Sequence, residues 1–573
     1  MKLSENIKYE LLMMNIERIP TQNFDNLGQH AIAGYLETKN FCAKVYSGVA
    51  SDCKSIITKA VQEDAVPVLG FYTATDNLPV VLHVIQWIKS AFDVFVFVGG
   101  PQAVMLKEDF LRESRCDAVI EGEGEIPVYQ LLSCLIDNLF PIDEVQSLRW
   151  IDENGKYREN PLAKPFCQLD EIPCPTKKRV LDGKYRDQIS FGILTGRGCP
   201  YHCAFCYEGA HTKNVRLRSI ENVMKEIQLA LTENPRLVYL NVYDDTFTLY
   251  PQRVYEFCEQ IKKYNLLWYC EGHVTNLIKH PEMVKRMVES GLIGLQIGIE
   301  SGSDSVLKAY NKNTSREMLM EVVRICRSAG LTRLVGNFIV GGAYETEETV
   351  YESMSLAEQM LTEGRGMFDC KNVFLAPYPH TPITLNPEKY DLEYQEEFEK
   401  TCVYSMYLPL MKVKAIPRER LIALKLEFDK RIQKKLDELS AFPTVGEVFR
   451  NFYWKNRMLN ASSAWKDRYS KLEHIVHFLE GTLSIQGKRY EQYSPENLDE
   501  LYPVRTFMLL DDRNEELHYK NITFTGAERA LLTYAAGKLT FRQIAQITHF
   551  PLMDLKKSYY QLFEYCFIYA SEF

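Results

Sequence analysis

The sequence lacks the features of an exported or membrane-spanning protein. No apolar run reaches the roughly 18 residues that suggest a transmembrane helix. The N-terminal segment has no apolar core of a signal peptide. Fifteen cysteines are spread along 573 residues and only three are clustered, which argues against a disulfide framework. We therefore expect a cytoplasmic protein with free thiols and no membrane partner.

The chain also lacks an excess of positive charge. Its 67 lysines and arginines against 76 aspartates and glutamates give a formal net charge of -9, which disfavours a broad surface for nucleic acid. The basic stretch 412–435 carries apolar residues at helical spacing, so we interpret it as the solvated face of a helix. The length is sufficient for about three or four domains with well-buried cores.

The three clustered cysteines form the most informative pattern. Cys199, Cys203 and Cys206 stand at C-x3-C-x2-C spacing on a glycine-rich turn after an apolar run. Three thiolates can hold three corners of a [4Fe–4S] cluster, which normally takes four cysteines, and so leave one iron open to a small molecule. The alternative is a zinc site with His202 as fourth ligand. We favour the cluster, because His202 adjoins Cys203 and no second Cys or Cys/His pair follows at zinc-ribbon distance.

The N-terminal region alternates short apolar runs with helical patterns, which predicts a parallel, doubly wound sheet. Its expected strands are residues 66–72, 94–98 and 118–120, and its expected helices are residues 27–38, 52–62 and 78–91. Ligands of such sheets lie beyond the carboxyl ends of the strands. Glycines at these ends let backbone approach a ligand closely, so the sequence predicts a binding crevice of unspecified ligand.

From residue 189 the same alternation continues for six units. It predicts a parallel barrel or partial barrel with its active site at the carboxyl ends of the strands. The expected strands are residues 189–194, 237–243, 268–274, 293–299, 334–340 and 373–376. The cysteines follow the first of these strands. Expected helices include residues 220–231, with Ser219 as N-cap, and 281–289.

Acidic residues follow two of the barrel strands. Asp244 and Asp245 adjoin the second strand, and two carboxylates at a barrel mouth require cations, hydrogen-bond donors or a metal. Either could instead form an Asx-type turn before the next helix. Glu300 follows the fourth strand, where a structural salt bridge is the alternative to a ligand contact.

The cysteine motif resembles that of the radical S-adenosylmethionine (SAM) enzymes, in which the open iron chelates SAM. The turn Gly99-Gly100-Pro101 and the stretch from Asp117 to Glu125 resemble the cobalamin-binding domain that precedes the cluster domain in one branch of these enzymes. The chain departs from many cobalamin proteins in lacking an Asp-x-His-x-x-Gly motif for a cobalt-binding histidine. A Rossmann-like domain that binds nothing is the alternative.

The resemblance implies three cofactors, a [4Fe–4S] cluster, SAM and cobalamin, with the three cysteines as ligands of the cluster. The implied SAM contacts are Phe205, Asp244, Asp245, Glu300, Ser301, Ile339 and Gly341. The implied cobalamin contacts are Gly70, Thr73, Thr75, Gly99, Gly100, Gly122 and Gly124. The loop after the fifth strand has Ala343-Tyr344 where the family usually has Pro-Gly.

The C-terminal third carries no metal or nucleophile pattern. Its tail has strand-like runs at 505–510 and 517–524, a capping box at Thr525, a second at Thr540, and a third helical run at 555–565. This order resembles the winged-helix module that recognises precursor peptides in many maturases of ribosomally made peptides. A DNA-binding helix-turn-helix fits as well, but the second helix has little basic charge.

We therefore predict an α/β protein with five parts. They are a Rossmann-like cobalamin-binding domain (1–145), a linker with a hairpin (146–185), a partial (β/α)6 radical SAM barrel (186–385), a mainly helical domain (386–500) and a winged-helix-like, peptide-recognition-like module (501–573). The linker is expected to carry little chemistry.

The predicted function is that of a cobalamin-dependent radical SAM methyltransferase acting on an unactivated carbon of a peptide or small molecule. The resemblance implies that cleaved SAM gives a 5′-deoxyadenosyl radical, which removes a substrate hydrogen before methyl transfer from methylcobalamin. It also implies an electron donor such as flavodoxin or ferredoxin, and no nucleic acid partner is expected. The alternatives are rearrangement or cyclisation of a small-molecule natural product, tRNA modification, and a non-enzymatic cobalamin- and DNA-binding sensor.

Overall fold

The computed structural model describes most of the chain. The described residues are 9–17, 26–74, 77–175, 188–211, 214–378, 380–396, 407–454, 457–459, 461–484, 498–508 and 517–571. The chain divides into two compact units, one of Met1–Leu319, Asn337–Glu352 and Asn372–Lys425, the other of Met320–Gly336, Ser353–Lys371 and Leu426–Phe573. All residues of the candidate site belong to the first unit.

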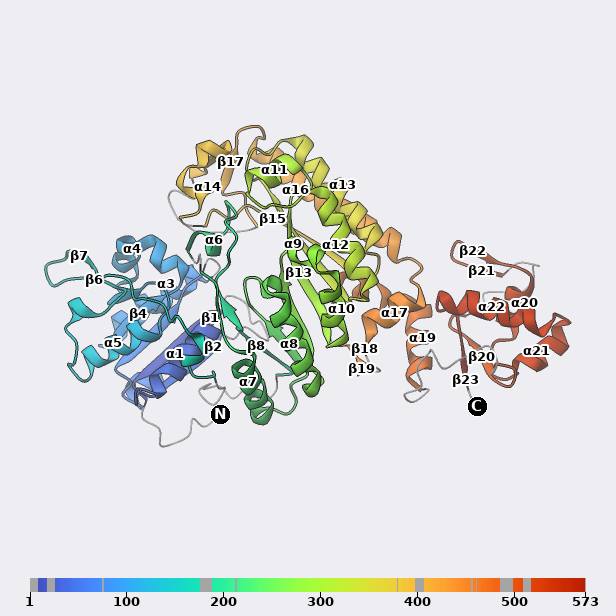
Figure 1. The fold of residues 1–573 in the computed structure, drawn as a ribbon, viewed down its shortest axis with the longest axis horizontal. Helices are drawn as coiled ribbons and strands as arrows, with labels where there is room; N and C mark the ends of the chain where they lie inside the picture. The colour runs from blue at the N-terminus through green and yellow to red at the C-terminus, as the bar shows by residue number, and fades with distance from the viewer. Residues whose placement is uncertain are drawn as a thin grey trace. The chain divides into compact units, whose positions relative to one another are not determined.

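The N-terminal region forms a sheet of order β2-β1-β3-β4-β5-β6-β7 with helices on both faces (Figure 1). The strands are β1 (Leu11–Glu17), β2 (Ala43–Val49), β3 (Val68–Tyr72), β4 (Phe95–Gly99), β5 (Ala118–Ile120), β6 (Leu148–Ile151) and β7 (Tyr157–Glu159). The helices are α1 (Leu27–Glu37), α2 (Ala50–Gln62), α3 (Leu78–Ala91), α4 (Pro101–Ser114) and α5 (Glu125–Leu135). β1 to β5 are parallel, and their order reverses direction between β1 and β3, which is the switch point where such sheets bind ligands.

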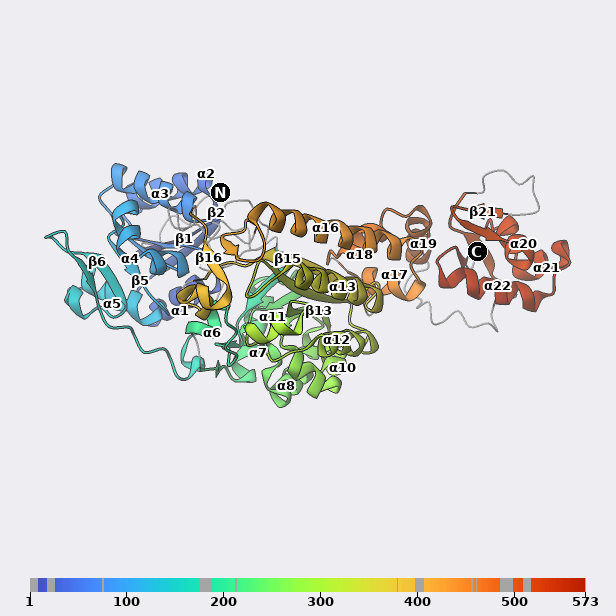
Figure 2. The ribbon, with the colours of Figure 1, turned by 90° about the horizontal axis from the view of Figure 1, so that it is seen from above.

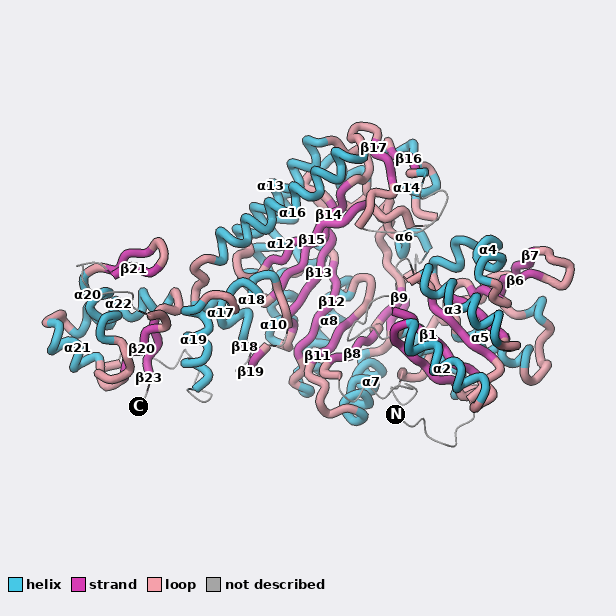
Figure 3. The backbone as a smooth tube through the Cα atoms, turned by 180° about the vertical axis from the view of Figure 1, so that it is seen from behind, coloured by secondary structure: helices cyan, strands magenta, loops and turns pink. Residues whose placement is uncertain are grey.

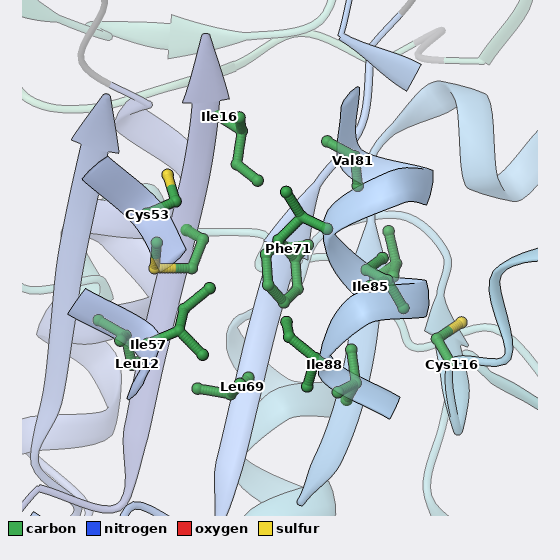
Figure 4. Close-up of a cluster of buried hydrophobic side chains, with 14 of the residues drawn as sticks. Leu12, Ile16, Cys53, Ile57, Leu69, Phe71, Val81, Ile85, Ile88 and Cys116 are labelled. Atoms are coloured by element: carbon green, nitrogen blue, oxygen red, sulfur yellow. The ribbon is translucent and has the colours of Figure 1, made fainter. Parts of the chain in front are cut away.

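Alternation along β1 explains why both faces of this sheet are apolar. Leu11 and Met13 face one hydrophobic cluster, whereas Leu12 and Met14 face the other. Figure 4 shows the second cluster, where side chains of α2 and α3 pack against β1 and β3 around Phe71. Burial of each such side chain contributes about 1.5–3 kcal/mol. β1 and β2 are not among the strands that the sequence pattern predicts.

The second α/β region forms a curled sheet of order β15-β14-β13-β12-β11-β8 (Figure 3). The strands are β8 (Ser190–Ile193), β11 (Tyr239–Val242), β12 (Leu267–Gly272), β13 (Leu292–Glu300), β14 (Arg333–Val340) and β15 (Phe368–Phe374). The helices are α7 (Ile220–Glu233), α8 (Pro251–Ile261), α9 (Val274–Lys279), α10 (Pro281–Glu289), α11 (Asp304–Ala309), α12 (Arg316–Ser328) and α13 (Glu347–Glu363). The strands neighbour one another in chain order, as in a (β/α) barrel, which confirms the predicted partial barrel.

The last barrel strand is longer than predicted. β15 begins at Phe368 rather than at residue 373. The predicted start was too late because Asp369 and Lys371 interrupt the apolar pattern in the first half of the strand. The predicted N-cap of α7 is confirmed, since the N–H of Asn222 donates to Ser219 Oγ at 3.1 Å.

Two short segments lead into and out of the cysteine loop. β9 (Gly196–Arg197) and β10 (Arg216–Leu217) pair antiparallel, with α6 (Tyr207–His211) between them in the chain. The predicted linker hairpin also forms, as β6 and β7. It extends the first sheet, because β6 pairs antiparallel with β5.

The rest of the chain is mainly helical. Its helices are α14 (Pro382–Leu385), α16 (Arg418–Ser440), α17 (Val445–Phe452), α18 (Ala464–Tyr469), α19 (Glu473–Ser484), α20 (Gly526–Tyr534), α21 (Phe541–Thr548) and α22 (Leu552–Glu564). Its strands are β16 (Leu392–Tyr394), β17 (Met411–Val413), β18 (Tyr453–Trp454), β19 (Arg457–Met458), β20 (Tyr502–Arg505), β21 (Leu517–Tyr519), β22 (Ile522–Phe524) and β23 (Ile568–Ser571). Over the residues that the structure covers, no helix is long and apolar enough to cross a bilayer.

The tail forms its three predicted helices around a core of its own (Figure 2). The capping box at Thr540 is confirmed, but the one at Thr525 is wrong: its side chain makes no capping bond. Gly526 has φ +54, so the residue after Thr525 is in the left-handed region. The winged-helix assignment stays a prediction.

Candidate functional site

The three cysteines lie on the loop between β9 and α6, directly after the first barrel strand. Cys203 is buried, while Cys199 and Cys206 are partly exposed, and none of the three is in a disulfide. Burial raises the pKa of Cys199 and of Cys203 to about 11, and the nearby sulfur of Cys206 adds to both shifts. These thiols therefore require a bound cation to become thiolates at neutral pH.

The donor set fits an iron–sulfur cluster better than a single metal ion. Among the residues that the structure describes, no group of three or more His, Cys, Asp or Glu side chains is close enough to hold one ion. A cubane binds each cysteine at a different iron, so its ligands stand farther apart than those of a mononuclear site. His202, the zinc ligand considered as an alternative, is exposed.

Aromatic contacts hold the cysteine loop in place. Tyr201 stacks on His273, with ring centroids 3.7 Å apart and planes at 12°. Phe205 meets Tyr310 edge-on at 4.9 Å, and the N–H of Ala204 donates to the carbonyl of Tyr310 at 2.9 Å. Burial and the charge of Lys312 lower the pKa of His273 to about 3, so its ring is neutral. These contacts fix the position of the loop.

The two aspartates after β11 differ in their hydrogen-bond partners and in whether they line a cavity. Asp244 is buried, and its oxygens accept the N–H of Thr195 at 2.6 Å and the hydroxyl of the same residue. Both oxygens therefore hold Thr195, which lies just after the first barrel strand, and a SAM contact by Asp244 stays a prediction. Asp245 accepts the N–H of Gly198 at 3.1 Å and lines a cavity. Burial raises its pKa to about 7, and the carboxylate of Glu208 adds to the shift.

Glu300 ends β13 as half of a buried ion pair. Its Oε1 lies 2.7 Å from Nζ of Lys312, and both side chains are less than 10% exposed. Glu300 also has φ +63, a left-handed conformation that costs about 1–2 kcal/mol for such a residue and is typical of functional sites. Ser301 is fully buried, and its hydroxyl accepts the N–H of Ser303 at 3.1 Å. The salt-bridge alternative for Glu300 is therefore present, and SAM contacts by Glu300 and Ser301 stay predictions.

The end of β14 carries Ile339, which is buried, and Gly341, which has φ +81. The N–H groups of Gly341 and Gly342 both donate to Glu345 Oε2, the second at 3.1 Å. The other oxygen of Glu345 and the hydroxyl of Tyr310 are buried without a hydrogen-bond partner among the described residues. Burial raises the pKa of Glu345 to about 7.

Glu345 is expected to make stability depend on pH. Its pKa is raised from 4.5 to about 7, so its contribution is complete below 4.5 and is lost as the pH rises through about 7. The free energy of unfolding should fall by at most about 3 kcal/mol over this range, and Glu345→Gln should abolish that part of the slope. Urea unfolding at several pH values measures it. The exposed control Glu352→Gln should keep the wild-type slope, and an unchanged slope in Glu345→Gln would contradict the assignment.

A cavity of about 660 Å³ lies at the carboxyl ends of the first sheet, within the range of about 300–1,000 Å³ for small-molecule and cofactor sites. Its lining includes these predicted cobalamin contacts: Gly70, Gly99, Gly100, Gly122 and Gly124. A Cβ at Gly122 would meet no atom within 4 Å, so the backbone there is open to a ligand. At Gly100, φ is +103 and a Cβ would lie 2.3 Å from the carbonyl of Thr73. The cavity thus fits a large ligand that lies against backbone.

Two predicted cobalamin contacts are not in this lining. Thr73 is fully buried, and its hydroxyl accepts the N–H of Ala103 at 3.1 Å and donates to the carbonyl of Gly99 at 3.3 Å. It therefore holds the first turn of α4, and its role as a ligand contact stays a prediction. Thr75 lies outside the described residues.

Several lining residues were missed by the sequence analysis. Residues 162–166 of the predicted linker line the cavity, as do Arg197, Tyr207 and Arg216. His273 directly follows β12, and the rule that strand ends form the site could have found it. Lys312 has no local signal, because only the fold brings it to Glu300.

Comparisons with known proteins agree with this geometry. A model of the B12 binding domain matches residues 20–132, and a model of the radical SAM superfamily matches residues 193–357. The first match covers β2 to β5 of the first sheet, and the second covers the cysteine loop and most of the barrel.

Two curated relatives each match more than half of this chain. An uncharacterized methyltransferase of Pyrococcus horikoshii is 29% identical over 391 residues, covering 66% of this chain and 82% of that protein. The anaerobic magnesium-protoporphyrin IX monomethyl ester cyclase of Rubrivivax gelatinosus is 25% identical over 348 residues, covering 58% of this chain and 59% of the cyclase. The match thus spans less than two thirds of the cyclase.

A solved structure shares the fold. The radical SAM methyltransferase TsrM from Kitasatospora setae, with cobalamin and a [4Fe–4S] cluster bound, aligns with a TM-score of 0.61 at 14% identity. The alignment covers 84% of this chain and 97% of TsrM. The chain therefore contains a B12-binding domain and a radical SAM domain, and these two domains imply a [4Fe–4S] cluster, SAM and cobalamin as its cofactors.

Proposed function

We propose that this enzyme methylates an unactivated carbon, using cobalamin and SAM together. The observation that carries the proposal is the shared lining of the cavity. Glycines of the B12-binding domain form one side, and Arg197, Gly198 and Tyr207, which lie next to the cluster cysteines in the chain, form another. Bound there, cobalamin supplies a methyl group and the cluster supplies the electron that cleaves SAM. A cavity lined from both sides can present one substrate to both cofactors.

The chain's own residues have separate tasks in this proposal. Cys199, Cys203 and Cys206 hold the cluster, and Asp244 fixes the start of their loop. The proposed SAM contacts are Phe205, Asp244, Asp245, Glu300, Ser301, Ile339 and Gly341. The carboxyl group of Asp245, with its pKa near 7, can hold or release a proton at neutral pH. Burial raises the pKa of Tyr207 to about 12, so its hydroxyl stays protonated in the cavity.

Product analysis tests the proposal. Under anaerobic conditions with a reductant and substrate, 5′-deoxyadenosine and S-adenosylhomocysteine are expected to form together in equal amounts. SAM labelled with deuterium in its methyl group should transfer the label to the product, as read by mass spectrometry. Formation of S-adenosylhomocysteine without 5′-deoxyadenosine would contradict radical methylation at an unactivated carbon.

A non-methylating ring closure is the second candidate, because one relative is named as a cyclase. It predicts 5′-deoxyadenosine without S-adenosylhomocysteine in the same assay. A non-enzymatic sensor would give neither product.

We further propose a ribosomally made peptide as substrate, recognised by residues 501–573. In the described part of this module, β21 and β22 pair only with each other, so each leaves an edge that an extended peptide can join. A short precursor reading frame is then expected beside the gene. Its labelled leader should bind the full-length enzyme in an anisotropy titration, and equal binding of a scrambled leader would contradict recognition.

A further inference from the structure

Two arginines join the B12-binding domain to the segment that carries the cluster. Arg197 on β9 stands two residues before Cys199, and Arg216 is its partner across the β9–β10 pair. Both guanidinium groups face the acidic loop 121–125, which follows the last parallel strand of the first sheet.

The contacts form a continuous network. Arg197 lies 2.9 Å from Glu123 and 2.7 Å from Glu125, through different nitrogens. Arg216 pairs with the same carboxylate of Glu123 and donates to the carbonyl of Phe166 at 2.9 Å. Glu123 of the first sheet therefore bridges two arginines, one on β9 and one on β10.

Burial makes these pairs stronger than ordinary surface ion pairs. The side chain of Glu125 is 3% exposed, that of Arg216 is 13% exposed and that of Arg197 is 19% exposed. Burial alone would raise the pKa of Glu123, but Arg216 and Arg197 hold it below its usual value. Bidentate, partly desolvated Arg–carboxylate pairs fix both distance and orientation.

The loop is also anchored at its other end. Glu121 pairs with Arg149 on β6, which belongs to the same sheet as the loop. The three glutamates of one short stretch thus face two ways. Glu121 pairs with an arginine of its own sheet, whereas Glu123 and Glu125 pair with arginines that flank the cysteine loop.

We propose that Arg197 and Arg216 are positioning residues that clamp loop 121–125 of the B12-binding domain to the cluster loop and so fix the distance between the two cofactors. Both cofactors must reach one substrate, and small errors of placement are costly in such reactions. Without specific contacts, domains joined by a linker move relative to one another by default. The clamp rests on the cofactor assignment, and it applies to methylation and ring closure alike.

Distance measurement by pulsed electron paramagnetic resonance tests the clamp. Cob(II)alamin and the reduced cluster each carry unpaired spin, so their dipolar coupling reports the distance between them. The wild-type enzyme should give one narrow distance distribution. Glu123→Gln keeps the shape of the side chain but removes the shared charge, and its distribution should become roughly twofold broader or shift.

Glu121→Gln is the matched control, because it changes the same residue type in the same loop but removes a pair within one sheet. Its distribution should match that of the wild type. Iron and cobalamin contents are measured on every sample, so that only loaded molecules are compared. A purely structural role would lower these contents without changing the distance in loaded molecules.

A wild-type distribution in fully loaded Glu123→Gln would overturn the clamp, as would equal broadening in Glu121→Gln. If Glu123→Gln does not fold, Arg216→Lys takes its place, since it keeps the charge and loses the paired geometry. A wild-type distance distribution in loaded Arg216→Lys, or equal broadening in Glu121→Gln, would then overturn the clamp. A wild-type enzyme that binds no cobalamin would overturn both the clamp and the proposed function, and the cobalamin content alone identifies that case.

Discussion

A Cys203→Ala variant is expected to lose the [4Fe–4S] cluster and all SAM cleavage. Three cysteines leave no spare ligand, because a cluster that has lost one of them is held at two corners only. Cys203 is also the most deeply placed of the three and sits beside Lys312. After anaerobic reconstitution, the wild type should contain about four irons per chain and form 5′-deoxyadenosine, whereas the variant should contain no cluster and form none.

The same result is expected for Cys199→Ala and Cys206→Ala. Cys167→Ala is the control, because Cys167 is an exposed thiol outside the loop and its loss should leave iron content and SAM cleavage unchanged. Full SAM cleavage by a reconstituted Cys203→Ala variant would contradict the cluster assignment. So would tetrahedral zinc in place of iron in the anaerobically purified wild type.

The parts of the site that follow from local pattern were predictable. The cysteine spacing is a chemical signature within eight residues of chain, and strand ends form the site in both kinds of parallel sheet. Alternating apolar runs gave β3, β4 and β5 nearly residue by residue. β1 was missed even though its residues are almost all buried.

Contacts between distant residues could not be predicted in this way. Glu123 pairs with Arg197, which is 74 positions later in the chain. No pattern in either segment predicts that the two residues are in contact. Polar residues at strand ends were likewise ambiguous. Asp244, Thr73 and Asp245 all accept backbone N–H groups, but only Asp245 of the three lines the cavity. The orientation of such a side chain depends on hydrogen-bond donors that come close to it only in the folded protein.

Lys312→Met is expected to destabilise the protein by about 3–5 kcal/mol, because it leaves the carboxylate of Glu300 buried without its partner. The double variant Lys312→Met/Glu300→Gln removes both charges and should be more stable than the single variant. Lys308→Met, at an exposed position of α11, should change stability by no more than about 0.5 kcal/mol. Urea unfolding measures all three, and a double variant no more stable than Lys312→Met would contradict the pairing.

The pH dependence of this pair has a definite sign. Burial favours the neutral amine, but Glu300 and the sulfur of Cys203 hold the pKa of Lys312 above its ordinary 10.5. The contribution of the ammonium group is therefore complete below 10.5 and is lost only as the pH rises further. In the wild type, the titration of Lys312 should accordingly add no pH dependence to the free energy of unfolding from about pH 7 to about pH 9. Because the same positive charge lies near Cys203, Lys312→Met should also release iron faster than the wild type when a chelator is added. Equal rates of iron release would show that Lys312 serves Glu300 alone and not the thiolates of the loop.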